Sequence, residues 1–112
     1  MPIANPELAK YTFLQPMRDD SYFPSLLVEK GAQILIDLCL AIEMKKPESK
    51  PALLVLTHAA TGRFNELAVE FEEAGSEIET AARDAIGVDI ETIVKTYGFD
   101  VEIEEAIASR DW

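Results

Sequence analysis

The sequence predicts an all-α fold, a compact antiparallel bundle of about five helices that forms a single domain over residues 1–112. Two long stretches, residues 24–45 and 50–74, carry apolar side chains at helical spacing. No stretch alternates between apolar and polar residues for long enough to form a strand. The apolar fraction of 48% is enough for one core despite a net charge of -11.

The N-terminal residues predict a short helix followed by an ordered connection. Asn5 can act as N-cap, with Pro6 in the first turn and Glu7 beside the positive helix end, and the helix extends to about Tyr11. Residues 11–24 (YTFLQPMRDDSYFP) contain several large side chains between prolines. We therefore expect this connection to be packed and not flexible.

The first long helix, Pro24 to Met44, is the predicted centre of the bundle. Lys45-Lys46-Pro47 ends it, because cations suit the negative helix end and proline cannot continue the helix. Ile36 and Leu40 lie at the edge of its polar strip. Either the N-terminal segment covers these two residues, or a second copy of the chain does so in a homodimer. The main apolar face comprises Leu27, Gly31, Ile34, Leu35, Leu38, Ala41 and Ile42.

The second long helix begins after Ser49, which can act as its N-cap, with Pro51 in the first turn. It extends to about Ala74 and should lie antiparallel to the first long helix, because the link between them is short. Its apolar positions follow steps of four and three: Leu53, Thr57, Ala60, Phe64, Leu67, Phe71 and Ala74.

Three glycines, Gly75, Gly87 and Gly98, each precede acidic residues in the C-terminal half. Each can end one helix at a position where glycine is favoured, and the acids can start the next helix. Ser76 and Glu79 also match a capping box.

Gly87 allows two interpretations. Apolar residues would also form one continuous helical face through residues 77–97, at a cost of about 1 kcal/mol for an interior glycine. We favour a kink or break at Gly87. A last helix is predicted from Val101 to about Ser109, and the terminal Trp112 either packs back onto the surface or anchors a partner.

The negative charge is confined to the C-terminal half. Residues 1–64 contain seven acidic and seven basic side chains, whereas residues 65–112 contain fourteen carboxylates and three basic side chains. This distribution argues against binding to nucleic acid or anionic membranes. We expect either an acidic surface that maintains solubility or a non-enzymatic protein with a basic protein partner, such as an immunity- or antitoxin-like inhibitor.

Cysteine usage and the N-terminus suggest a cytoplasmic protein. Cys39 is the only cysteine, so a disulfide framework and a thiolate zinc site are both excluded. Its apolar surroundings predict an inert thiol. The first residues have no basic signal-peptide region, and the apolar run in the central helix is too short to span a membrane.

Few residues suggest a catalytic or metal-binding role. The acidic series Glu66, Glu70, Glu73 and Glu77 lacks the Glu-x-x-His pairs of a di-iron bundle, so we predict no metal or cofactor. His58 lies among apolar residues, where a structural hydrogen bond is expected more often than a general base.

The alternative function is a small-molecule or metal-dependent activity that uses His58 and nearby carboxylates. Polar residues embedded in apolar stretches are the first places to look for any such site. They are Arg18, Asp19, Asp20, Tyr22 and His58.

Most of the chain resembles a family of small bacterial proteins classed as a domain of unknown function. The resemblance rests on MRDDSYFPSLLVEKG, LTHAATGRFNELAVEFEE, SEIETAARD and YGFDVEIEEAIASRDW. It implies a compact helical protein. No activity is assigned to the family, so the resemblance supplies no catalytic residues.

Overall fold

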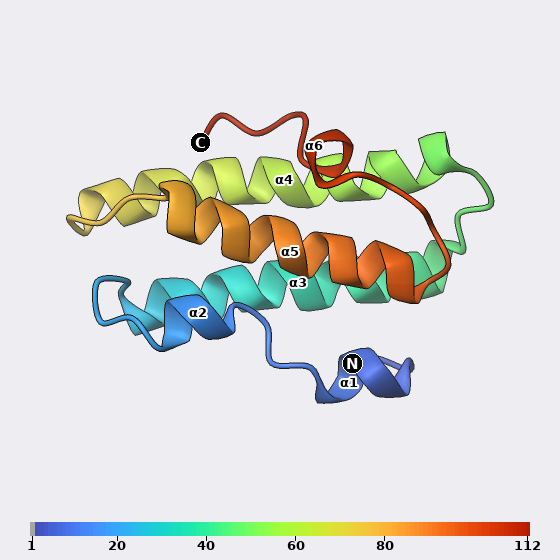
Figure 1. The fold of residues 1–112 in the computed structure, drawn as a ribbon, viewed down its shortest axis with the longest axis horizontal. Helices are drawn as coiled ribbons and strands as arrows, with labels where there is room; N and C mark the ends of the chain where they lie inside the picture. Colours follow the sequence, from blue (N-terminus) through green and yellow to red (C-terminus); the bar gives the residue numbers. More distant parts are fainter. Residues whose placement is uncertain (1) are drawn as a thin grey trace.

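A computed structural model describes residues 2–112 and contains only helices and their connections within that range. The all-α class is therefore confirmed (Figure 1). The helices are α1 (Pro6–Lys10), α2 (Gln15–Arg18), α3 (Ser25–Lys45), α4 (Lys50–Glu73), α5 (Thr80–Thr96) and α6 (Ile103–Ala106).

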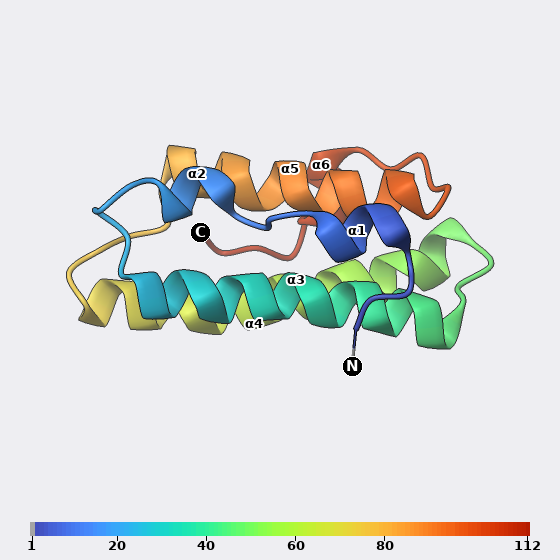
Figure 2. The ribbon, with the colours of Figure 1, turned by 90° about the horizontal axis from the view of Figure 1, so that it is seen from below.

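The helices form two layers (Figures 1 and 2). The long helices α3 and α4 lie side by side in one layer, and α5 lies over them with the three short helices. Ion pairs Lys30–Glu70, at 2.6 Å, and Asp37–Arg63, at 2.9 Å, show that α3 and α4 are antiparallel, as predicted. One apolar core fills the space between the layers. Its largest fully buried side chains include Phe64, Phe71, Leu35, Leu53, Ile86, Ile90 and Ile93.

The two predicted N-caps are confirmed. The Asn5 side-chain oxygen accepts hydrogen bonds from the N–H groups of Glu7 and Leu8 at the start of α1. The Ser49 hydroxyl accepts one from the N–H of Ala52 in α4. In each case a side chain satisfies backbone donors that the helix itself leaves free.

Gly75 and Gly98 end α4 and α5, as their positions predicted. Both adopt positive φ, 82° and 90°. The N–H of the next residue reaches back five residues, from Ser76 to the Phe71 oxygen and from Phe99 to the Val94 oxygen, which is a Schellman motif. The predicted capping box is wrong, because Ser76 belongs to the end of α4 and α5 starts only at Thr80.

The expected break at Gly87 is also wrong, because α5 continues through it from Thr80 to Thr96. The glycine serves a packing purpose instead. A Cβ at Gly87 would lie 2.8 Å from Cγ2 of Ile103, at the start of α6. The missing side chain thus lets α6 pack directly on α5.

The last helix is shorter than predicted, covering only Ile103–Ala106. The chain then turns along α4, where the N–H of Asp111 donates to the side-chain oxygen of Asn65 at 3.0 Å. Trp112 packs edge-on against Phe64, with ring centroids 6.2 Å apart. These contacts with α4 replace the last predicted helical turns, and Trp112 packs back onto the protein.

The N-terminal segment partly covers the apolar edge of α3. Ile36 and Leu40 are both half-buried. Ile36 lines a surface cavity of about 250 Å³ together with Leu8, Tyr11 and Phe13. The connection after α1 contains the short helix α2, which the sequence did not predict.

Replacing Gly87 by Ala should destabilise the protein by about 1–2 kcal/mol, because overpacking against Ile103 outweighs the gain in helix propensity. Gly62→Ala is the matched control, since Gly62 is also inside a helix but a Cβ there would meet nothing within 4 Å. The control should stabilise by about 0.5–1 kcal/mol. Urea unfolding measures both, and equal effects of the two substitutions would contradict the packing role.

Candidate functional site

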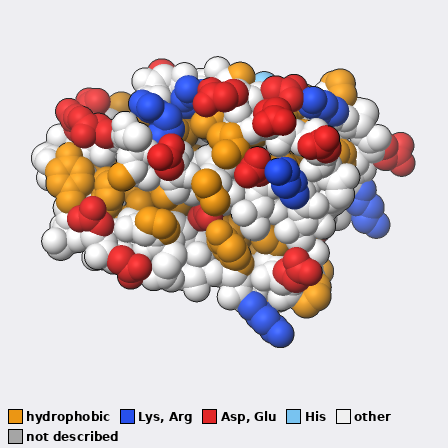
Figure 3. Space-filling model, viewed as in Figure 1, with side chains coloured by type: hydrophobic (Ala, Val, Ile, Leu, Met, Phe, Trp, Pro, Cys, Tyr) orange, Lys and Arg blue, Asp and Glu red, His pale blue; other side chains and the backbone are white. Residues whose placement is uncertain are grey.

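Most acidic side chains of the C-terminal half have no cationic partner within the described residues. Acidic groups are spread over the face that carries α5, with hydrophobic side chains exposed between them (Figure 3). Four carboxylates after residue 64 form ion pairs: Glu70, Glu91, Glu104 and Glu105. Nine others are exposed and form no ion pair with a described residue: Glu66, Glu72, Glu73, Glu77, Glu79, Asp84, Asp100, Glu102 and Asp111.

The closest crowding of like charges occurs at the turn between α4 and α5. Glu72, Glu73, Glu77 and Glu79, which we call the turn cluster, are all exposed. A hydrogen bond between the carboxyl groups of Glu77 and Glu79 raises the pKa of Glu77, and the negative charges of Glu79 and Glu72 raise it further. The turn cluster is therefore a site of strong negative potential at one end of the molecule.

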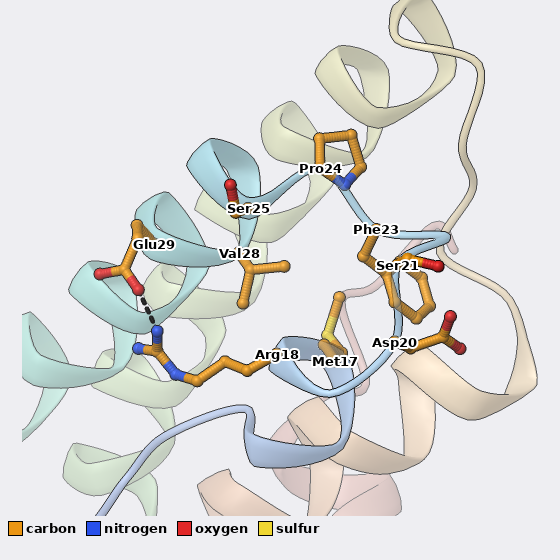
Figure 4. A pocket seen from close by; sticks show the side chains of 9 residues that line it. All are labelled: Met17, Arg18, Asp20, Ser21, Phe23, Pro24, Ser25, Val28 and Glu29. Atoms are coloured by element: carbon orange, nitrogen blue, oxygen red, sulfur yellow. Dashed lines mark hydrogen bonds and ion pairs between the residues drawn. The ribbon is translucent and has the colours of Figure 1, made fainter.

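Two of the predicted site residues line a pocket of about 420 Å³ at the start of α3 (Figure 4). The Arg18 guanidinium forms an ion pair with Glu29 across α2 and α3, and its Nε donates to the Phe13 oxygen at 2.9 Å. Asp20 lies on the other side of the pocket from Glu29. The two Arg18 contacts tie α2 to α3 and to the segment before α2.

Asp19 and Tyr22 have local roles in the same loop. The Asp19 carboxylate accepts a hydrogen bond from the Gln15 side chain at 2.9 Å, and the Asp20 carboxylate accepts one from the Tyr22 N–H at 2.9 Å. The Tyr22 ring is half exposed and packs edge-on against Phe23. These hydrogen bonds shape the turn between α2 and α3.

His58 is not among the residues that line this pocket. It is half-buried on α4, and its Nε2 lies 2.8 Å from the Glu105 carbonyl oxygen in α6. The carboxylate of Glu105 forms an ion pair with Lys50 at 2.8 Å. Thus the structure brings Arg18 and Asp20 together but leaves His58 at the α4–α6 contact.

The acidic series on α4 does not converge on one point. Glu70 is paired with Lys30, whereas Glu73 and Glu77 belong to the turn cluster. Among residues 2–112, no three His, Cys, Asp or Glu side chains are arranged to hold a metal ion. Cys39 is fully buried, and burial raises the pKa of its thiol to about 12.

Asp89 is a buried carboxylate that the sequence interpretation missed. It is 4% exposed on α5, and it accepts hydrogen bonds from the Tyr11 hydroxyl at 2.7 Å and the Leu14 N–H at 2.6 Å. Burial raises the pKa of Asp89, although the two hydrogen bonds offset part of the effect. Leu14 has a φ of 58°, so this carboxylate holds a backbone conformation that is rare for leucine.

Glu43 is a second anchor for the N-terminal segment, and it is half-buried. Its carboxylate accepts hydrogen bonds from the N–H groups of Ala4 and Asn5, each at 2.9 Å, and from the Tyr97 hydroxyl at 2.6 Å. Burial disfavours its charged form, but the three hydrogen bonds outweigh this effect and lower the pKa of Glu43. The donors are distant in sequence, so no local pattern identified the role.

We compared the sequence with models of known protein families. Residues 7–112 match a family of unknown function, DUF5713. The chain belongs to that family. This confirms the resemblance to a domain of unknown function seen in the sequence. Comparison with curated proteins and with solved structures finds no match. None of the helices in residues 2–112 of this DUF5713 member has the length and apolar character needed to cross a membrane.

Glu43→Gln should destabilise this DUF5713 protein by about 1–3 kcal/mol at pH 7, because an amide cannot accept all three hydrogen bonds. The lowered pKa means that the carboxylate contributes fully above its ordinary pKa of 4.5 and loses this contribution as the pH falls through the folded-state pKa. The difference between wild type and variant should therefore shrink below about pH 4.5.

Urea unfolding over a pH series measures this difference. Glu48→Gln is the control, because Glu48 is exposed and its side chain makes no hydrogen bond with a described residue, and its effect should stay within about 0.5 kcal/mol. If the difference in unfolding free energy between wild type and Glu43→Gln remains constant down to the pH of acid unfolding, the role of the charge would be contradicted.

Proposed function

We propose that this protein is a non-enzymatic, cytoplasmic interaction protein that binds a basic protein partner through its acidic C-terminal half, as an immunity- or antitoxin-like inhibitor does. The observation that carries the proposal is the turn cluster. Glu72, Glu73, Glu77 and Glu79 lie together without a cationic partner among residues 2–112.

Repulsion between like charges acts within the turn cluster. Its side chains form no hydrogen bond with another element among residues 2–112, and the pKa of Glu77 is raised first by its hydrogen bond with Glu79 and then by the negative charges of Glu79 and Glu72. Lysine or arginine side chains of a partner would relieve this repulsion on binding. A field of one sign also increases the rate at which an oppositely charged protein associates.

A neighbouring groove supports the same kind of partner. It lies between α5 and α6 and has a volume of about 450 Å³. Its lining includes Val88, Ile103, Asp84 and Glu102, together with the cation Arg83. Val88 is about half exposed there. A long basic side chain has an apolar stem and a charged end, which match the apolar and carboxylate groups of this groove.

No observation at His58 favours the alternative activity with nearby carboxylates. The Nε2 atom already lies within hydrogen-bond distance of the Glu105 oxygen, and the Glu105 carboxylate is paired with Lys50. His58 therefore stabilises the contact between α4 and α6.

The test uses a lysine-rich peptide as a probe for the basic surface of a partner. Glu77→Gln/Glu79→Gln removes two charges from the turn cluster and should weaken binding at least about threefold in low salt. Glu7→Gln/Glu48→Gln removes two exposed charges from the neutral half and should change binding less than twofold, or about 0.4 kcal/mol. Fluorescence anisotropy at about 20 mM and about 200 mM salt measures both affinities.

Binding of the wild-type protein should weaken steeply between the two salt concentrations, because the attraction is electrostatic. Equal losses in the two double variants would show that only the total charge matters, and would contradict a docking role for the turn cluster. The absence of binding at low salt would overturn the proposal as a whole.

A further inference from the structure

The outward side of α4 is a long helical face with no covering element among residues 2–112. Its positions follow steps of three and four, like those of the buried face, but they point away from the core. We call it the α4 outer face. It comprises Ala52, Val55, Ala59, Gly62, Glu66, Val69 and Glu73.

Two valines make this face apolar. Val55 is 68% exposed and Val69 is 54% exposed, so both place an apolar side chain in contact with solvent. Ala59 and Gly62 lie between them, and because these residues are small, few side-chain atoms cover the α4 backbone there. A Cβ at Gly62 would meet nothing within 4 Å, so no contact within the described chain requires a glycine there.

The elements beside α4 leave this face open. On one side α3 approaches, with the ion pair between Asp37 and Arg63. On the other side the C-terminal segment approaches, where Asn65 donates to the Ser109 oxygen at 3.1 Å. The α4 outer face lies between these two lines of contact. Ala52, Val55, Ala59 and Gly62 follow one another along the face, and contiguous exposed apolar surface typically marks a protein interface.

The charges along α4 indicate which partner fits. Residues 50–62 contain Lys50 and no acidic residue, whereas residues 63–73 contain four glutamates and one arginine. A basic partner would meet no carboxylate over the first half of the face. A second copy in antiparallel orientation would place the acid-free half of each helix against the acidic half of the other.

We propose that the α4 outer face binds a second copy of this chain about a two-fold axis at Gly62. Val55 and Val69 each lie seven residues from Gly62, so this axis packs Val55 of one copy on Val69 of the other, twice. The small Ala59 and Gly62 let the two helices approach closely at the axis. Antiparallel helix dipoles also attract each other, whereas a parallel pair would bring the eight glutamates together.

The size of the face predicts a weak dimer. A helix of 24 residues is about 36 Å long and about 10 Å wide, so each copy buries roughly 360 Å². Stable interfaces bury about 800 Å² per partner, so this dimer should form only at high chain concentration. The contact differs from the dimer through Ile36 and Leu40 that the sequence suggested, since those residues are half-buried.

Sedimentation equilibrium up to about 1 mM chain, in about 0.15 M salt, tests the association. The average mass should rise from 12.4 kDa toward twice that value with concentration. Val55→Asp and Val69→Asp should each weaken dimerisation at least tenfold. Leu26→Asp, at a similarly exposed apolar residue on α3, should leave it unchanged. A monomer at every concentration, or equal effects of all three substitutions, would overturn the proposal.

Cysteine cross-linking tests the arrangement. Under mild oxidation, Gly62→Cys alone and the double variant Val55→Cys/Val69→Cys should form disulfide-linked dimers, whereas either valine variant alone should not. Native Cys39 is fully buried and provides a low background. Efficient cross-linking of Val55→Cys alone would indicate a parallel pair and would overturn the two-fold arrangement. Circular dichroism confirms that each variant is folded.

Discussion

The packing of Leu14 against Gly31 connects the two layers of this protein. A Cβ at Gly31 would lie 2.8 Å from Cδ1 of Leu14 and 3.3 Å from Cε1 of Phe64, so only a glycine lets α3 meet both residues. The Leu14 N–H is in turn held by the buried Asp89 carboxylate on α5. Leu14, at the start of α2, and Gly31 in α3 together therefore link α2, α3, α4 and α5, and the left-handed backbone of Leu14 is maintained by the surrounding contacts.

Local signals in the sequence were sufficient to predict the long helices and most of their ends. Asn5 and Ser49 cap their helices through contacts with residues two or three positions away, and Gly75 and Gly98 end theirs in the same local manner. Such interactions depend only on neighbouring residues. For this reason propensity and spacing were enough to identify them.

The errors involved interactions between residues distant in sequence. Gly87 has the same local context as the other two glycines, but the approach of Ile103 determines its role. Because Gly87 was interpreted as a helix end, Asp89 was taken for an acid at a helix start, although Ile86 and Ile93 place it on the edge of an apolar face. Of the candidate residues, Arg18 and Asp20 line one pocket, and their contacts hold the surrounding chain in place.

The buried hydrogen bond from Leu14 to Asp89 spans 75 residues, and this has a consequence for synthesis of the chain. The pair α3 and α4 can form as soon as residue 73 is available, because its contacts lie within one helical hairpin. The Leu14 N–H and the Tyr11 hydroxyl gain their buried partner only once Asp89 in α5 has been made. At about 5–20 residues per second, a ribosome takes roughly 4–15 s to add those 75 residues. During that interval the Leu14 N–H, and the left-handed backbone at this residue, have no Asp89 carboxylate to hold them.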